Sequence, residues 1–169
     1  MENLWAPWRM AFIEPKTPPK PGCIFCTQPA EHRDEEHYIL HRGEHCFMML
    51  NLYPYNNGHL MIAPYGHVGS LELLDAVTLG ELMAQAQLAL RALRMTMNPD
   101  GFNMGINQGK AAGAGFAEHI HYHIVPRWHG DTNFMPVLAD IKVIPEHLDA
   151  VYQKLQGALK EIVGMKSSH

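Results

Sequence analysis

The sequence has 169 residues, of which 47% are hydrophobic, and a formal net charge of -4. This length suits one domain with its own core, and the hydrophobic fraction excludes a disordered chain. The acidic balance supplies no positive field, so we expect neither nucleic acid nor a membrane surface as a partner. No apolar run reaches the roughly 18 residues of a membrane span, and residues 1–13 lack the pattern of a signal peptide. We therefore expect a cytoplasmic protein.

The chain begins with a short aromatic arm and a proline-rich connector. Trp5, Trp8 and Phe12 lie in the arm, and four prolines follow within residues 14–22. Such a proline density is typical of an extended segment. We interpret residues 1–22 as an arm that packs on its own domain or on a partner subunit, and residues 23–169 as a single domain.

Two short apolar segments predict a β-hairpin. Residues 46–50 have the composition of a buried strand, and residues 59–63 form a second apolar run that Pro64 would end. The segment between them, residues 52–58, is rich in Pro, Asn and Gly, as turns are.

A long amphipathic helix is predicted from about residue 78 to residue 97. Thr78 and Glu81 have the spacing of a capping box, and apolar residues follow at helical intervals. Residues 102–107 predict a third strand, and residues 110–115 form a loop rich in Gly and Ala.

A fourth strand and a second long helix complete the pattern. Residues 119–125 predict a strand that Pro126 would close, and Pro145 opens a last helix with Gly164 as its cap. Strands in hairpin order with two separate helices predict an α+β domain. We expect an antiparallel sheet of about five strands, one long central helix and a C-terminal helix.

Three histidines alternate along the predicted fourth strand. Side chains alternate between the faces of a strand, so His119, His121 and His123 share one face, with about 7 Å between successive members. One alternative is a coincidental polar face in a chain with 12 histidines. Another is a metal centre built from all three, although a flat strand spreads its side chains while a metal needs converging ligands. We favour a catalytic role.

The loop before this strand is suited to phosphate. Gly109, Gly113 and Gly115 allow the backbone to approach an anion closely, and successive amides can form a cradle for it. A short Gly-rich loop is a weak signal alone and gains weight beside a row of histidines.

Cys23 and Cys26 form a Cys-x-x-Cys pair. Two thiolates on one tight turn make half of a tetrahedral zinc site, and a redox pair is the alternative. Redox pairs usually begin a helix, and Pro29 with the flanking prolines argues against a helix here.

These motifs together resemble the histidine triad (HIT) family. The stretch 119–125 resembles the family signature, and residues 51–64, 102–109 and 23–26 resemble three further family motifs. The resemblance spans about residues 23–127 and implies a HIT-like catalytic domain over residues 23–169. Residues 4–9 and 126–134 resemble the subgroup that includes bacterial diadenosine tetraphosphate phosphorylases.

The resemblance implies roles for the histidines and the glycine loop. His121 maps to the nucleophile of the family, His123 to a phosphate contact and His59 to a supporting histidine. Backbone amides near Gly113 and Gly115 would bind phosphate. Where many members carry Ser or Gln donors, this chain has Ala114, Gly115, Phe116 and Ala117.

The resemblance also implies the remaining ligand contacts. Asn51 maps to the residue that holds the ribose hydroxyls, Leu52 to the base pocket and Asn107 to a phosphate or ribose contact. His67 and His119 would join Cys23 and Cys26 in a structural Zn²⁺ site.

The implied function is cleavage of dinucleoside polyphosphates through a nucleotidyl-histidine, with phosphate as the acceptor. Alternatives within this class are hydrolysis of dinucleoside polyphosphates or of nucleoside phosphoramidates. A non-catalytic nucleotide-binding module is the alternative from another class, and a metalloenzyme that uses the triad as its metal centre is a third. Family members are commonly homodimers that join two sheets, so we expect a homodimer.

Overall fold

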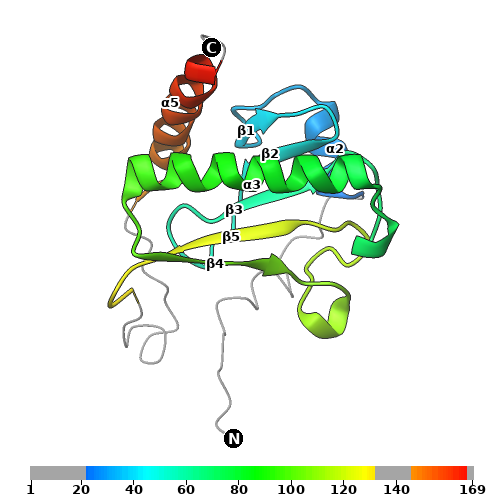
Figure 1. Ribbon diagram of the computed structural model, residues 1–169. Helices are drawn as coiled ribbons and strands as arrows, with labels where there is room; N and C mark the ends of the chain where they lie inside the picture. Colours follow the sequence, from blue (N-terminus) through cyan, green and yellow to red (C-terminus); the bar gives the residue numbers. More distant parts are fainter. Residues whose placement is uncertain (1–21, 132–145, 167–169) are drawn as a thin grey trace, which may run out of the picture.

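The computed structural model describes residues 22–131 and 146–166, and within them it has an antiparallel sheet with three α-helices (Figure 1). The sheet has five strands in the order β1-β2-β3-β5-β4. The strands are β1 (Ile39–Arg42), β2 (Cys46–Leu50), β3 (Leu60–Pro64), β4 (Gly101–Ile106) and β5 (Tyr122–Arg127). The helices are α2 (Ile24–Ala30), α3 (Ala76–Met97) and α5 (Leu148–Lys166), with 3-10 turns at Leu71–Leu73 and Lys110–Ala112. The predicted α+β class, the five-stranded sheet and the β2–β3 hairpin are confirmed.

The two faces of the sheet carry separate cores. Met48 and Ile62 point to one face, where they pack with Leu82 of α3 and Leu155 of α5. The alternate residues form a smaller core on the opposite face, which α2 covers with Phe25; its sheet members are Ile39, Phe47, Met49, Met61 and Ala63. His123 pairs with Met61 across β5 and β3, so the histidine-bearing side of β5 faces this smaller core.

The predicted capping box of the long helix is wrong. The N-cap of α3 is Asp75, whose side chain accepts a hydrogen bond of 2.7 Å from the backbone N–H of Thr78. Glu81 lies one turn further on and accepts from the backbone N–H groups of His45 and Cys46. An Asp at the N-cap satisfies the first free amides of a helix, so the helix begins earlier than expected.

Both prolines that were expected to end strands lie within them. Pro64 belongs to β3 and Pro126 to β5. β3 and β5 pair between Leu60–Ile124 and Ile62–Tyr122, and each proline lies outside this paired stretch. The missing N–H of each proline therefore costs no hydrogen bond between β3 and β5. β5 begins at Tyr122, so His119 and His121 precede the regular strand.

Three further local expectations need correction. Cys23 is the N-cap of α2 and Pro29 lies inside this helix, so the argument that prolines prevent a helix here is wrong. Gly164 lies within α5, which continues to Lys166. The expected loop of residues 110–115 contains the 3-10 turn Lys110–Ala112. Pro145, the aromatic arm and nearly all of its connector lie outside the described residues.

No helix among residues 22–131 and 146–166 combines the length and the apolar character that a membrane crossing requires.

The turn after β5 is held by a carboxylate whose side chain is 8% exposed. Asp131 accepts hydrogen bonds from the Arg127 guanidinium, from Asn56 in the β2–β3 loop and from the backbone N–H of Trp128. Hydrogen bonds from Arg127 are the main reason that its pKa falls to about 2. A carboxylate whose pKa is lowered by folding stabilises the fold above its unfolded pKa of about 3.9, and this contribution disappears as the pH falls toward 2.

Asp131→Asn is therefore expected to lower the free energy of unfolding by about 1–2 kcal/mol at pH 7. Urea unfolding at pH 7, 4 and 3 should show the difference from wild type shrinking as the pH falls. Glu44→Gln, at a side chain that is 86% exposed, is the control and should change little. A difference that stays constant down to pH 3 would contradict this assignment.

Candidate active site

The three alternating histidines are brought together, but they are buried rather than displayed. The exposed fractions of His119, His121 and His123 are 0%, 5% and 8%. The ring centroids of His121 and His123 are 4.7 Å apart. Burial lowers the pKa of His119 and of His121, and specific hydrogen bonds decide which ring nitrogen carries the proton.

One hydrogen bond defines the tautomer of His121. Its Nδ1 lies 2.9 Å from the backbone carbonyl oxygen of His119. A carbonyl only accepts, so Nδ1 carries the proton and Nε2 keeps its lone pair. Burial lowers the pKa of His121, partly offset by this hydrogen bond, and so favours the neutral ring. A neutral imidazole with a free Nε2 lone pair is a nucleophile.

A relay of hydrogen bonds sets the tautomers of His59 and His123 in a similar way. The backbone N–H of Tyr55 donates to Nδ1 of His59 over 3.0 Å, so neutral His59 carries its proton on Nε2. This Nε2 lies 2.9 Å from Nδ1 of His123. His123 therefore accepts at Nδ1 and, when neutral, carries its proton on Nε2. The predicted supporting histidine thus fixes the tautomer of the third triad member.

Asn51 lies next to this relay. Its side-chain amide nitrogen is 3.3 Å from Nδ1 of His59, and its oxygen accepts from the backbone N–H of Tyr53. The neighbouring Leu52 is 42% exposed. The turn after β2 therefore places a polar side chain, Asn51, beside His59 and leaves the apolar Leu52 exposed next to it in the chain.

The loop between β4 and β5 contains Asn107, Gly113 and Gly115. Gly113 has a φ of 84°, a left-handed conformation that favours glycine. Gln108 anchors this loop: its Oε1 accepts from the backbone N–H of Leu71, and its Nε2 donates to Ser70. Sequence reasoning missed Gln108, because a polar residue beside a glycine loop does not reveal the direction of its side chain.

Cys23, Cys26, His67 and His119 converge in one cluster, with their four ligand atoms within 4.8 Å of one another. Nδ1 of His119 lies 3.3 Å from Sγ of Cys23, 3.5 Å from Sγ of Cys26 and 3.2 Å from Nδ1 of His67. Tetrahedral zinc with bonds of about 2.0 Å to nitrogen and 2.3 Å to sulfur separates its ligands by about 3.3–3.8 Å. The cluster has nearly this geometry.

The donor set also suits a cation. Nε2 of His119 lies 2.9 Å from the carbonyl oxygen of Pro64, so Nε2 carries the proton and the lone pair of Nδ1 points into the cluster. Burial raises the pKa of the Cys26 thiol, and the adjacent Cys23 raises it further. A divalent cation would reverse this effect by stabilising the thiolates. By contrast, Cys46 is fully buried in β2, and burial raises its pKa to about 12, so it is an inert core residue.

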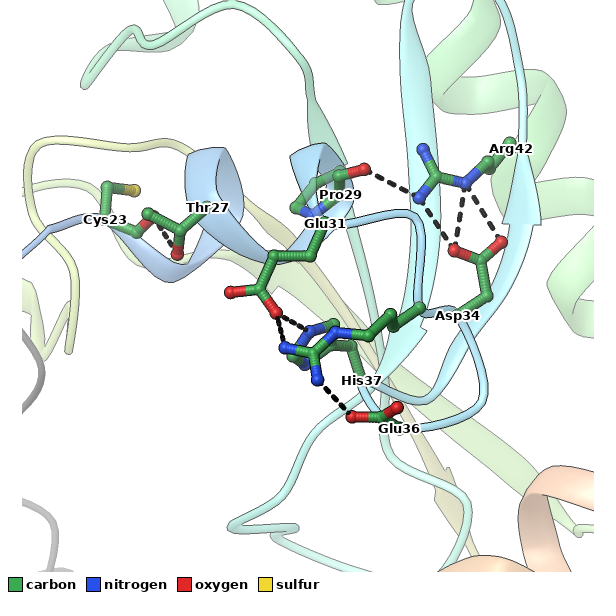
Figure 2. Close-up of polar contacts among 9 residues, drawn as sticks. Cys23, Thr27, Pro29, Glu31, Asp34, Glu36, His37 and Arg42 are labelled. Atoms are coloured by element: carbon green, nitrogen blue, oxygen red, sulfur yellow. Dashed lines mark hydrogen bonds and ion pairs between the residues drawn. The ribbon is translucent and has the colours of Figure 1, made fainter.

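In addition to the cysteine contacts with His67 and His119, polar contacts connect helix α2 to β1 (Figure 2). Arg42 of β1 donates to the carbonyl oxygen of Pro29, near the end of α2, and makes a bidentate contact with Asp34. Phe25 projects from α2 into the smaller core and contacts both His119 and His121. Sequence reasoning missed this contact, because the position of Phe25 between two cysteines does not indicate where its ring lies.

The sheet, the three buried histidines and the neighbouring donor cluster define a histidine triad protein. A family model described as the HIT domain matches residues 33–130, and the chain belongs to this family. It is 42% identical to the AP-4-A phosphorylase of Mycobacterium tuberculosis strain H37Rv in an alignment of 155 residues that covers 88% of this chain and 79% of that protein.

Solved structures agree with this assignment. A Zn-bound histidine triad family protein from Mycobacterium smegmatis has a TM-score of 0.69 and 28% identity, over 85% of this chain and 97% of the other. A hypothetical histidine triad nucleotide-binding protein from Sulfolobus tokodaii has a TM-score of 0.65 and 27% identity, over 84% and 92%. The predicted family and HIT-like fold are confirmed.

Proposed function

We propose that this protein is a HIT-type enzyme that cleaves dinucleoside polyphosphates of the diadenosine tetraphosphate type, with inorganic phosphate as the acceptor. The observation that carries the proposal is the buried His121, whose Nδ1–H donates to the His119 carbonyl and leaves Nε2 as a nucleophile. The 42% identity to an AP-4-A phosphorylase supports this class of enzyme and substrate.

The reaction has two displacements at the same phosphorus. Nε2 of His121 attacks the α-phosphorus of one adenosine, a nitrogen–phosphorus bond forms, and the bond to the bridging oxygen breaks to release ATP. An oxygen of inorganic phosphate then attacks the same phosphorus. The nitrogen–phosphorus bond breaks, ADP leaves and His121 is regenerated.

Donors around the phosphoryl group would stabilise the charge of each transition state. His123 carries its proton on Nε2 when His59 donates to its Nδ1, so it is suited to donate to a phosphoryl oxygen. Backbone amides near Gly113 and Gly115 are proposed to bind the other oxygens. This backbone cradle would replace the Ser and Gln donors of other members.

The nucleoside part would be held at the turn after β2 and at the start of the β4–β5 loop. Asn51, beside His59, is proposed to bind the ribose hydroxyls, and exposed Leu52 to pack against the base. Asn107 is proposed as a further phosphate or ribose contact. An apolar side chain with a few placed polar groups is the usual composition of such a pocket.

The four-residue cluster is proposed to hold Zn²⁺ through Cys23, Cys26, His67 and His119. Four protein ligands would fill a tetrahedral shell, as in structural rather than catalytic zinc sites. Bound there, zinc would supply a crosslink between α2 and the segment before β5. Because His119 belongs to this cluster while His121 and His123 bond elsewhere, the geometry does not favour a metal centre made from the whole triad.

The homodimer stays a prediction. β4 is an edge strand of the described sheet, and its Met104 is 42% exposed. Antiparallel pairing of two β4 strands would join two sheets and cover both edges. Sedimentation velocity should then give twice the chain mass of 19.1 kDa.

Product analysis tests the function directly. The 169-residue, zinc-loaded protein is incubated with diadenosine tetraphosphate, with and without ³²P-labelled phosphate, and the nucleotides are separated. We expect ATP plus ADP, formed only with phosphate, and label in the β-phosphate of ADP because phosphate attacks the histidine-bound AMP. AMP plus ATP would indicate a hydrolase. No turnover of this substrate or of adenosine phosphoramidate would favour a binding module.

A further inference from the structure

We propose that Phe25 is a positioning residue for His121, so that the helix of the Cys-x-x-Cys motif sets the orientation of the nucleophile. The proposal rests on the proposed function, because it assumes that Nε2 of His121 is the attacking atom. It concerns a residue that touches no substrate and acts through its ring contact with the imidazole.

The ring of Phe25 stacks on that of His121. Their centroids are 4.6 Å apart and their planes differ by 27°. The ring of His123 meets the imidazole of His121 edge-on, with the centroids 4.7 Å apart and the planes at 74°. The torsion that rotates an imidazole about its bond to Cβ has broad minima, so the ring plane needs external contacts to be fixed. The hydrogen bond to His119 fixes one atom of the ring, and the stack with Phe25 fixes its plane.

Phe25 is itself rigidly placed. It is 1% exposed and belongs to the smaller core. Its ring also meets Phe116 edge-on at 5.7 Å and His119 at 5.2 Å. Helix α2 is held at its start by the cysteine cluster and near its end by the bond from Arg42 to the Pro29 carbonyl. A ring fixed in this way can transmit the position of α2 to the nucleophile.

Phe25→Leu tests the proposal, because leucine keeps an apolar side chain but lacks the flat ring. We expect kcat for diadenosine tetraphosphate to fall about 10-fold with little change in KM, since misorientation of a nucleophile affects the reaction more than binding. Phe47→Leu is the matched control: it makes the same change in the same core, at a fully buried residue that stacks on Tyr65 rather than on a histidine. It should lower the melting temperature to a similar extent and leave kcat unchanged.

A readout without substrate separates this proposal from the proposed function. In protein labelled with ¹⁵N-histidine, wild-type His121 should show only the Nδ1–H tautomer, and Phe25→Leu should show a mixture of tautomers. Zinc content should match wild type in both leucine variants. If wild type turns over no dinucleoside polyphosphate, the proposed function fails, and the spectra still decide the role of Phe25.

Three results would overturn the positioning role. One is a Phe25→Leu enzyme with unchanged His121 signals. Another is a Phe47→Leu enzyme with an equal loss of kcat, which would indicate a general effect of the core. The third is loss of zinc in Phe25→Leu, which would place the effect at the metal site. Should Phe25→Leu not fold, Phe25→Met, with a longer and more flexible side chain, gives the same comparison.

Discussion

His121→Asn is expected to reduce the turnover of diadenosine tetraphosphate by about 10⁴-fold or more. Removing a nucleophile abolishes the covalent route and leaves only the stabilisation that the remaining donors give. Asparagine fills part of the same space and can donate to the His119 carbonyl, so the fold should be retained. The measurement is kcat under saturating phosphate, with circular dichroism to check folding.

Binding and covalent chemistry are separated by two further measurements. A non-hydrolysable dinucleotide should bind His121→Asn about as tightly as wild type, because the proposed contacts at Asn51 and Leu52 remain. Acid-quenched wild type should contain a histidine-bound AMP that the variant lacks. His129→Asn, at a histidine whose side chain is 95% exposed, is the control and should keep full activity. An active His121→Asn enzyme would rule out the covalent mechanism.

Sequence patterns predicted the sheet well where a short apolar run forms a fully buried strand. Residues 46–50 form β2 as expected, and the next apolar run forms β3 beside it. Element ends were predicted less well, because they depend on contacts from elsewhere in the chain. Glu81 was paired with Thr78 on helical spacing, but its carboxylate binds the amides before β2, which are about 35 residues distant in sequence.

The candidate site was also predicted only in part from the sequence. Alternation along residues 119–125 placed the three histidines on one face, but it did not show that all three are buried. Their separate roles depend on which nitrogen carries the proton, and that is set by the carbonyls of Pro64 and His119 and by the amide of Tyr55. Backbone groups leave no mark in a sequence pattern. Only the resemblance to the HIT family suggested different roles for the three rings.

Cys23→Ser is expected to remove zinc from the protein without weakening the start of α2. Cys23 is the N-cap of this helix and makes no side-chain capping bond, whereas serine is among the favoured N-cap residues. A loss of stability in this variant therefore reports the lost metal rather than a damaged helix. We expect zinc to fall from one per chain to near zero, with a loss of about 3 kcal/mol or more in stability when zinc is present.

The melting temperature should accordingly fall by roughly 6–12 °C. Cys46→Ala is the control, because Cys46 is buried in β2 and is not part of the cluster. This variant protein should keep one zinc per chain. His121→Asn should also retain zinc, which would separate the proposed metal ligand His119 from the proposed nucleophile His121. Zinc retained at wild-type level in Cys23→Ser would contradict the site. Zinc lost from His121→Asn would contradict the division of roles within the triad.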